Sequence, residues 1–483
     1  MLAGALVGTG FLAKMLQTFL VVPAFAGVWL LAAPVSLGRR IRDLVLAGAA
    51  LAVTAGWWVL VVALWPAADR PYIGGSQTDS VLELTLGYNG FGRLTGDETG
   101  SVGGGPGDGW GETGIGRLLG SEMGAEASWL IPAALLLLVV LLRLSRREPR
   151  TGPLRAAALL WLVVTGAVFS FAAGIIHPYY TVALAPAIGA LVGIGAVELW
   201  RRRSDVRARA TLAAALAVTA CWAGILLGRT DWQPWLTWAF PIVGVLAAVA
   251  LLGLHRLPRL VVPAVVVAAL LGGVGGPVAY SLATATTPHT GAIPSSGPEN
   301  AGRGFGGGGR GPGQSTGQGA PPNGTFDGTR RGSFGGGGGG GGRGGGAGGL
   351  LGAPTPSASL TALLSRDGSS YTWAAAAVGS NNAAGYQLAT QLPVMAVGGF
   401  NGTDPAPTLE QFKDLVAQKQ IHWFVSGSGG FGGGLGGRTT GTDTGGSDVS
   451  ERITAWVEAT FTPTTVDGTT VYDLTASASA VTS

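Results

Sequence analysis

The stretch HPYYTVALAPAIGALVGIGAVELWRRR (177–203) decides the fold class of this chain. Its residues 179–199 are apolar over the ~20 positions that a helix needs to cross a bilayer. One end carries His177 and two tyrosines, and the other end carries three consecutive arginines. Aromatic residues anchor helices at the membrane interface, and arginines favour the cytoplasmic side. The sequence therefore predicts a spanning helix whose aromatic end faces outward.

Similar apolar runs fill the first 280 residues and then stop. Only 12% of residues are charged, whereas about a quarter are charged in an ordinary soluble protein. We therefore predict a mainly α-helical polytopic membrane protein with about eight transmembrane helices. The expected spans are residues 15–34, 44–65, 127–143, 155–175, 179–199, 210–228, 236–254 and 260–281. The apolar residues 1–12 are too short to span, and they resemble the end of a helix whose beginning is missing.

The loops between these spans alternate in charge. Four of them are basic, with arginines at 39–42, 143–155, 201–209 and 256–259. The positive-inside rule places these loops in the cytoplasm. The intervening loops and everything after residue 281 are then extracytoplasmic, which predicts a multi-pass cell-membrane protein. Because the net charge of +4 comes from these clusters, we do not expect a nucleic-acid partner.

Residues 284–357 are dominated by glycine and cannot bury enough apolar surface to fold, so they predict a flexible linker. Residues 358–483 alternate between strand-like and helix-like segments, which predicts a small extracytoplasmic α/β domain with a largely parallel sheet. The single cysteine, Cys221, lies in an apolar run and excludes an intramolecular disulfide. The expected strands are 372–380, 393–399, 421–427 and 471–475, and the expected helices are 382–390, 408–420 and 448–460.

The loop 66–126 contains the first candidate site, SVLELTLGYNGFGRLTG (80–96). Its glycines allow close approach of the backbone, while Tyr88, Asn89 and Arg93 offer stacking, amide and guanidinium groups. Sugars are bound by such a mixture, and lipid phosphates are bound by arginine. The alternative is a glycine-rich turn at the membrane surface without a ligand.

The second candidate site is HPYY (177–180), where His177, Tyr179 and Tyr180 lie at the outer mouth of a span. These residues are either interface anchors or a functional group of side chains. Lys14 is the only lysine before residue 413 and lies between two apolar stretches. It could pair with a phosphate or simply extend to the membrane surface.

These stretches carry a resemblance to a known family. RPYIGGSQTDSVLELTLGYNGFGRLTG (70–96) and IIHPYYTVALAPAIGALVGIGAVELW (175–200) resemble the actinobacterial branch of glycosyltransferase family 39. That family is related to protein O-mannosyltransferases and to the aminoarabinose transferase of lipid A. The opening GTGFLAKMLQTFLVVPAF (8–25) is similar to the family's segment around a lysine between two helices. The segments TWAAAAVGS, LPVMAVGGF and FKDLVAQKQIHWFVSG resemble the outer domain of mannosyltransferases of the YkcA/YkcB type.

The resemblance implies a GT-C fold and an inverting sugar transfer at the outer face. The donor would be a polyprenyl-phosphate-linked sugar, and the acceptor a protein or a cell-envelope glycan. In the family, the base lies in an acidic motif of the first extracytoplasmic loop. This sequence starts beyond that motif, so it is expected to lack an N-terminal part. Asp79 and Glu83 lie near the first candidate site, but no base is assigned to either.

The sequence thus predicts a membrane glycosyltransferase, mannosyl in type, that contains no metal site. Lys14 and Arg93 are expected to contact the donor phosphate, while Tyr88, Asn89, His177, Tyr179 and Tyr180 line the sugar–lipid site. One alternative is a membrane anchor without catalysis that presents an envelope-binding α/β domain. A transporter is disfavoured, because the predicted spans hold almost no ionisable residues for a coupling ion.

Overall fold

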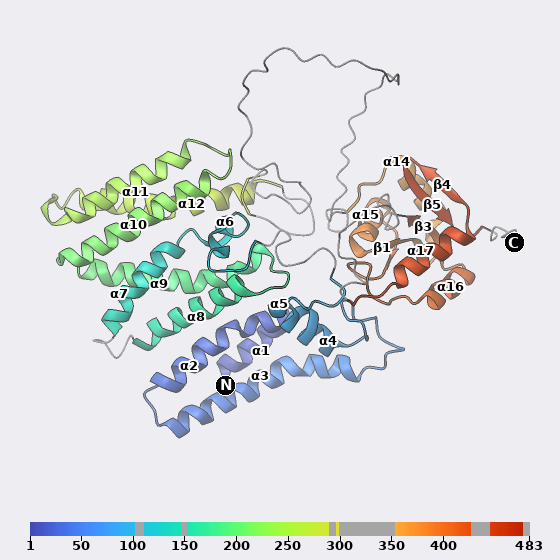
Figure 1. Cartoon of the computed structure of the whole chain (residues 1–483), viewed down its shortest axis with the longest axis horizontal. Coiled ribbons are helices and arrows are strands. Elements are labelled where there is room, and N and C mark those ends of the chain that lie inside the picture. The colour runs from blue at the N-terminus through green and yellow to red at the C-terminus, as the bar shows by residue number, and fades with distance from the viewer. Residues whose placement is uncertain (102–110, 146–151, 289–295, 299–352, 427–444, 477–483) are drawn as a thin grey trace, which may run out of the picture.

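The computed structural model describes residues 1–101, 111–145, 152–288, 296–298, 353–426 and 445–476. Most of the predicted linker 284–357 and the basic residues 146–150 lie outside these ranges. The described chain forms a helical part up to Thr286 and an α/β part after residue 353 (Figure 1).

The helical part combines long apolar helices with short helices in the outer loop. Among the described residues, five helical segments are long and apolar enough to cross a membrane: Leu2–Ala32, Leu37–Leu64, Pro178–Arg201, Val206–Leu227 and Val262–Thr286. Three shorter apolar helices cover Ile131–Val140, Ala156–Phe171 and Leu236–Leu252. The chain is therefore a membrane protein, while the predicted number of eight spans stays a prediction. The apolar helices of this part are α1 (Leu2–Lys14), α2 (Val22–Ala32), α3 (Leu37–Leu64), α7 (Ile131–Ser145), α8 (Gly152–Phe171), α9 (Ala185–Arg201), α10 (Val206–Leu227), α11 (Leu236–Leu252) and α12 (Val262–Thr286).

The apolar first residues form the helix α1, which continues the expected apolar run 1–12 as far as Lys14. A tight turn at Met15 (φ 43°) and a 3₁₀ helix (Met15–Val21) separate α1 from α2, so the expected span 15–34 begins with a break. Helix α1 packs against α3 at Gly4 and Gly8. A Cβ at Gly4 would lie 1.9 Å from the Ala47 carbonyl oxygen. This small-xxx-small spacing lets two helix backbones approach closely, and it was present in the sequence.

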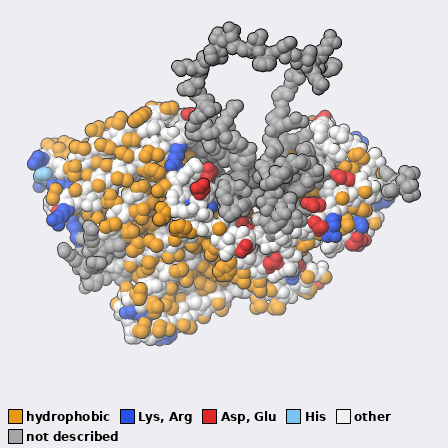
Figure 2. Space-filling model, in the orientation of Figure 1, with side chains coloured by type: hydrophobic (Ala, Val, Ile, Leu, Met, Phe, Trp, Pro, Cys, Tyr) orange, Lys and Arg blue, Asp and Glu red, His pale blue; other side chains and the backbone are white. Residues whose placement is uncertain are grey.

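The helices form two neighbouring groups. Helices α1, α2 and α3 pack together, and α2 also packs against α8 of the group formed by α7 to α12. Figure 2 shows hydrophobic side chains spread over these helices and acidic side chains gathered near their junction with the α/β part. The α2–α3 turn, followed by Arg39, Arg40 and Arg42 at the start of α3, and the α9–α10 turn, which begins after Arg201 and carries Arg202 and Arg203, lie at the end of the helices away from the α/β part (Figure 1).

The loop 66–126, predicted to be extracytoplasmic and called the outer loop below, contains among its described residues a 3₁₀ helix (Arg117–Leu119) and four further short helical elements, where the alternative interpretation of the sequence was a glycine-rich turn. Ser80 caps α4 by accepting a hydrogen bond from the Glu83 amide. A π-helical turn follows, in which Gly90 departs from helical angles (φ −121°, ψ −111°). Irregular helical turns of this kind often occur at functional sites. The elements are α4 (Val81–Leu86), the π turn (Gly87–Phe91), α5 (Gly92–Thr95) and α6 (Gly124–Ala127).

The C-terminal part is a five-stranded sheet in the order β2-β1-β3-β5-β4. Strand β1 pairs in parallel with β2 and β3, whereas β5 runs antiparallel to both β3 and β4. The sheet is therefore parallel on one side only. The Asp467-Gly468 turn between β4 and β5 has positive φ at both residues, a pattern typical of a β-hairpin that the sequence analysis overlooked. The strands are β1 (Trp373–Val378), β2 (Val394–Val397), β3 (Ile421–Ser426), β4 (Pro463–Val466) and β5 (Thr469–Asp473).

Helices cover both faces of this sheet, as expected for an α/β layer structure. Phe412 of α16 and Ile453 of α17 pack with Phe424 of β3 on one face. Leu364 of α14 and Tyr386 of α15 pack on the other face. Thr408 begins α16 with a capping box that includes Gln411. The helices are α14 (Ala358–Ser365), α15 (Ser380–Thr390), α16 (Leu409–Ala417) and α17 (Val449–Thr460). The first of these helices was not predicted.

Candidate functional site

The structure brings Lys14 and the HPYY stretch together. Lys14 is the last residue of α1, and its Nζ lies 4.5 Å from the ring centre of Tyr180 and 5.7 Å from that of Tyr179. Gln17, in the following 3₁₀ helix, donates a hydrogen bond to the Tyr180 carbonyl oxygen at 3.4 Å. An ammonium group at this distance over an aromatic face is attracted by the ring. The break after α1 therefore places a cation directly beside the outer aromatic residues.

The three aromatic side chains of HPYY pack against one another. The rings of His177 and Tyr179 are stacked with centres 5.3 Å apart, and Tyr180 meets both edge-on at 5.0 and 4.8 Å. Pro178 starts a 3₁₀ helix (Pro178–Leu184) that leads into α9 and sets this spacing. Burial, with help from the positive charges of Arg93 and Lys14, lowers the pKa of His177 to about 3. The imidazole is therefore neutral near pH 7.

Arg93 joins the outer-loop motif to the HPYY segment. Its guanidinium lies 4.6 Å from the ring centre of Tyr88, one turn earlier in the same motif. Its Nη1 donates a hydrogen bond to the Ile175 carbonyl oxygen at 3.1 Å and forms an ion pair with Glu98 Oε1 at 2.9 Å. The two motifs, more than 80 positions apart, are thus joined through a single side chain.

Glu98 is the site residue that sequence reasoning missed. Only 2% of its surface is exposed, and its carboxylate accepts hydrogen bonds from the Ile175 amide at 3.0 and 3.1 Å. Burial raises the pKa of Glu98, while the positive charge of Arg93 and the Ile175 amide act in the opposite direction. The space around this carboxylate exists because Gly174 has no side chain, since a Cβ there would lie 2.7 Å from Glu98 Oε1. No local pattern in the sequence predicts this contact.

Asn89 connects the motif to the break after α1. Its side-chain amide lies 3.6 Å from the sulfur of Met15. Gly90 allows this approach, because a Cβ there would lie 2.9 Å from Leu16 and 2.5 Å from the Thr85 carbonyl oxygen. All seven residues predicted from the sequence therefore lie around one region, formed by the end of α1, the outer loop and the start of α9.

The charges of this region do not cancel. Glu98 neutralises Arg93, but within the described residues no carboxylate forms an ion pair with Lys14. Lys14, Arg93 and Glu98 together carry a net charge of about +1, and the Glu126 carboxylate lines the neighbouring pocket beside Tyr179. A single negative charge, such as that of a phosphodiester, would complete the balance.

Asp79 and Glu83, the carboxylates next to the motif, hold the loop in shape. Asp79 forms an ion pair with Arg70 at 3.1 Å and accepts a hydrogen bond from the Ile73 amide at 2.8 Å. Burial opposes ionisation of Glu83, but hydrogen bonds from the Thr78 hydroxyl and two backbone amides outweigh it and lower its pKa. Both side chains are therefore occupied in loop contacts and do not face the aromatic cluster.

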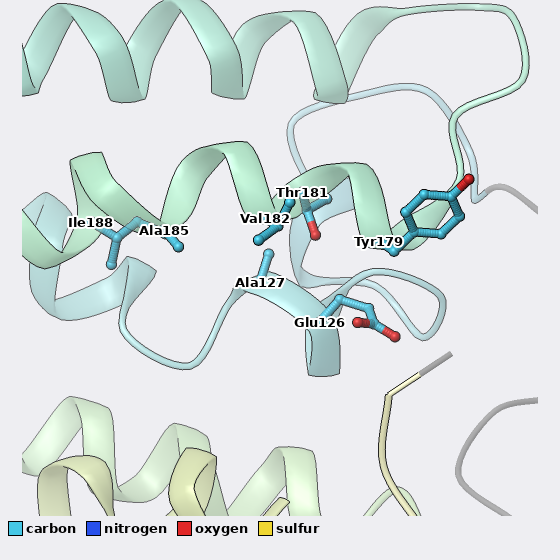
Figure 3. A pocket seen from close by; sticks show the side chains of 7 residues that line it. All are labelled: Glu126, Ala127, Tyr179, Thr181, Val182, Ala185 and Ile188. Carbon is cyan, nitrogen blue, oxygen red and sulfur yellow. The ribbon is translucent and has the colours of Figure 1, made fainter. Parts of the chain in front are cut away.

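A pocket of about 320 Å³ lies beside Tyr179 (Figure 3). Tyr179 and Glu126 stand at one end of it, and Ile188 stands at the other. One carboxylate oxygen of Glu126 accepts a hydrogen bond from the Ser296 amide at 2.8 Å. The pocket thus has a polar end next to the aromatic cluster and an apolar remainder along α9. Its lining residues are Glu126, Ala127, Tyr179, Thr181, Val182, Ala185 and Ile188.

Comparison with known proteins finds one matching family model and two similar proteins named as mannosyltransferases. A family model described as "Putative mannosyltransferase YkcB-like, C-terminal" matches residues 360–460, most of the α/β part. Over this part, the chain is therefore similar to that family. "Putative mannosyltransferase YkcB" of Bacillus subtilis (strain 168) is 29% identical to it, across 88% of this chain and 67% of the relative. "Putative mannosyltransferase YycA" of the same organism is 26% identical, across 88% of this chain and 68% of the relative. No solved structure gives a significant match to this chain.

Proposed function

We propose that this chain is a membrane glycosyltransferase that uses a polyprenyl-phosphate-linked hexose, with mannose as the expected sugar. The observation that carries the proposal is the positive charge of Lys14 beside the packed rings of His177, Tyr179 and Tyr180. Aromatic rings offer flat apolar surfaces for a sugar, and the ammonium group is suited to the single charge of the linking phosphate. The two curated relatives are both named as mannosyltransferases, which supports the same class.

In this proposal the cations have different tasks. Lys14 contacts the donor phosphate, because its charge has no partner carboxylate among the described residues. Arg93 is largely engaged by Glu98, Tyr88 and the Ile175 carbonyl, so it orients the outer-loop motif and adds a second positive charge at the rim. The apolar part of the pocket along α9 is suited to the first isoprene units of the donor. Its polar end, with the Glu126 carboxylate, would repel the phosphate toward Lys14.

The proposed reaction takes place at the extracytoplasmic face. The HPYY segment directly precedes α9, and Arg201–Arg203 lie at the other end of that helix, where arginine-rich turns favour the cytoplasm. Transfer also needs a base that accepts the proton of the acceptor hydroxyl. Glu98 is buried in its ion pair and Glu83 is held by loop hydrogen bonds, so the cluster is assigned donor binding and neither carboxylate is assigned that role.

The test is a transfer assay with the full chain in liposomes. Radiolabelled polyprenyl-phosphate mannose is supplied with an envelope extract as the source of acceptor, and loss of sugar from the lipid fraction is measured. We expect consumption of the mannosyl donor and slower consumption of the glucosyl analogue. If the liposomes neither bind nor consume either donor, the proposal is wrong, and the anchor alternative is favoured.

A further inference from the structure

The β2–α16 turn of the α/β domain contacts the outer loop of the helical part. The carboxylate of Asp404 accepts a hydrogen bond from the Gly75 amide at 3.0 Å. The hydroxyl of Thr403 and the amide of Asn401 both donate to the Gly100 carbonyl oxygen, at 2.7 and 3.2 Å. Three side chains of one short turn therefore bind two backbone sites about 300 positions earlier in the chain.

These contacts are buried and the turn is shaped for them. Asp404 is 4% exposed and Thr403 is 6% exposed, so water competes little for their hydrogen bonds. Gly399 has a positive φ of 65°, and a Cβ there would collide with the Asp404 carboxylate. The hydroxyl of Ser450, on α17, donates a hydrogen bond to the Gly402 carbonyl oxygen and so attaches the turn to α17. The turn thus presents its polar side chains in one fixed arrangement.

The two backbone sites bracket the candidate site. Gly75 precedes α4, and Gly100 follows α5 by a few residues, so Tyr88, Asn89 and Arg93 lie between the two anchored points. Gly100 is also only two residues from Glu98, whose carboxylate holds Arg93. Fixing both ends of a segment reduces the number of conformations that its middle can adopt.

The contact also involves the edge of the sheet at which α/β domains usually bind their ligands. The turn follows the carboxyl end of β2, next to the carboxyl end of β1. Gly445, before α17, approaches the same loop, since a Cβ there would lie 3.4 Å from the methyl group of Thr99. In the anchor alternative, an envelope polymer would bind the α/β domain at this edge of the sheet. The outer loop already occupies part of that edge.

We propose that the α/β domain docks through residues 398–404 onto the outer loop of its own chain and positions the segment 75–100. The docking itself stands on the contacts above. Its consequence for donor binding rests on the proposed function. Asn401, Thr403 and Asp404 are positioning residues in this scheme, because they touch the loop and not the donor.

Cysteine crosslinking tests the docking without any need for turnover. In a Cys221→Ser background, Gly74→Cys is paired with Asp404→Cys, because a Cβ at Gly74 would lie 3.5 Å from Asp404 Oδ2. The control pairs Gly74→Cys with Gln418→Cys, an exposed position after α16. We expect an intramolecular disulfide in the first pair and none in the control. Equal crosslinking of both pairs, none in the first, or a disulfide-linked dimer would overturn docking within one chain.

A second measurement asks whether docking positions the site. Thr403→Val removes the hydroxyl that binds Gly100 and keeps the side-chain shape, and one ordinary hydrogen bond shifts an equilibrium about fivefold. Combined with Asn401→Ala, it is expected to raise the KM for polyprenyl-phosphate mannose several-fold with little change in kcat. The control is Asp414→Ala, an exposed residue of α16. The positioning role would be overturned if Thr403→Val/Asn401→Ala reduced the crosslink between Gly74→Cys and Asp404→Cys and left the KM unchanged. Absence of turnover in every variant would count against the proposed function alone.

Discussion

The carboxylate of Glu98 lies 2.9 Å from the guanidinium of Arg93, and both contact the backbone of Ile175. This pair joins the outer-loop motif to the HPYY segment. The Glu98 side chain is almost completely buried, and the Arg93 side chain is largely buried. Two charges taken from water need each other, because a buried charge without its partner is strongly destabilising. The connection between the two motifs therefore depends on an electrostatic balance as well as on packing.

Removal of one partner should thus cost more than removal of both. We expect Arg93→Leu to destabilise the folded protein by about 3–5 kcal/mol, because Glu98 would remain buried without a counter-charge. The double variant Arg93→Leu/Glu98→Leu should recover a large part of that loss. Thermal unfolding of the detergent-solubilised protein measures both effects.

An exposed ion pair of the α/β domain provides the control for this comparison. Lys413 and Glu410 are 2.9 Å apart, but the Glu410 side chain is 78% exposed. Such pairs contribute at most about 1 kcal/mol, so Glu410→Ala should change the unfolding temperature little. If Arg93→Leu were no more destabilising than Glu410→Ala, the Glu98–Arg93 pair would not hold the site together.

Lys14 should control donor affinity through its charge. We expect Lys14→Gln to weaken binding of polyprenyl-phosphate mannose about tenfold or more, because a charge-assisted contact contributes about 1.5–3 kcal/mol. Lys14→Arg should keep most of the affinity. Lys419→Gln, at an exposed lysine just after α16, serves as the matched control. Binding to protein in nanodiscs is measured at two salt concentrations, and equal affinity of the Lys14→Gln and unmodified proteins would exclude Lys14 from the phosphate site.

The neutral state of His177 makes stability depend on pH. Its pKa is lowered from 6.5 to about 3 in the folded protein, chiefly by burial. Above pH 6.5 neither state binds the proton, and between pH 6.5 and about 3 only the unfolded chain does. Stability should therefore fall as the pH decreases through this window, by up to about 1.4 kcal/mol per unit. The raised pKa of Glu98 acts with the opposite sign, so only a comparison of variants isolates His177.

That comparison uses the apparent unfolding temperature at pH 7.5 and pH 5.5. His177→Gln should lose less stability between the two values than the unmodified protein does. His255→Gln, at an exposed histidine in the α11–α12 turn, should behave like the unmodified protein. Identical pH profiles for His177→Gln and the unmodified protein would show that His177 is not held neutral by its surroundings.

Much of this arrangement follows from local patterns in the sequence. Apolar length and arginine positions identify the helical part, and the strand–helix alternation after residue 358 correctly predicts β1, α15, β2, α16, β3, α17 and β5. The proximity of Lys14 to Tyr179 and Tyr180 follows from placing span ends on one side of a membrane. Each of these inferences starts from a pattern that is local in the chain, and the common direction of the spans then brings the ends of distant helices together.

The contacts that the sequence did not predict are long-range. Glu98 looked like one of several loop carboxylates, and its partner Arg93 is nearby, but its burial depends on Gly174 from another segment. The docking of Asp404 on Gly75 likewise joins parts of the chain that no period or motif connects. The Gly4–Gly8 spacing of α1 is different, since its signal was local and was overlooked.

Gly4 and Gly8 should be essential for the packing of α1 on α3. A Cβ at Gly8 would lie 2.0 Å from the Thr54 hydroxyl and 2.5 Å from the Leu51 carbonyl oxygen. Gly8→Leu should therefore push α1 away from α3, destabilise the protein by at least about 1–3 kcal/mol and move Lys14 from the tyrosines. Gly48→Leu is the control, because nothing lies within 4 Å of a Cβ at that glycine of α3. Equal unfolding temperatures and donor affinities for the two variants would contradict close packing of α1.

The orientation of the chain can be tested at both ends of the helices. The α9–α10 turn carries Arg202 and Arg203, and the α/β domain lies at the opposite end (Figure 1). The positive-inside rule predicts that the turn is cytoplasmic and the domain extracytoplasmic. A reporter that fluoresces only in the cytoplasm should be dark when fused after Ser483 and bright when inserted at Ser204. The reverse pattern would place the aromatic cluster on the cytoplasmic side and would remove the argument for donor binding at the outer face.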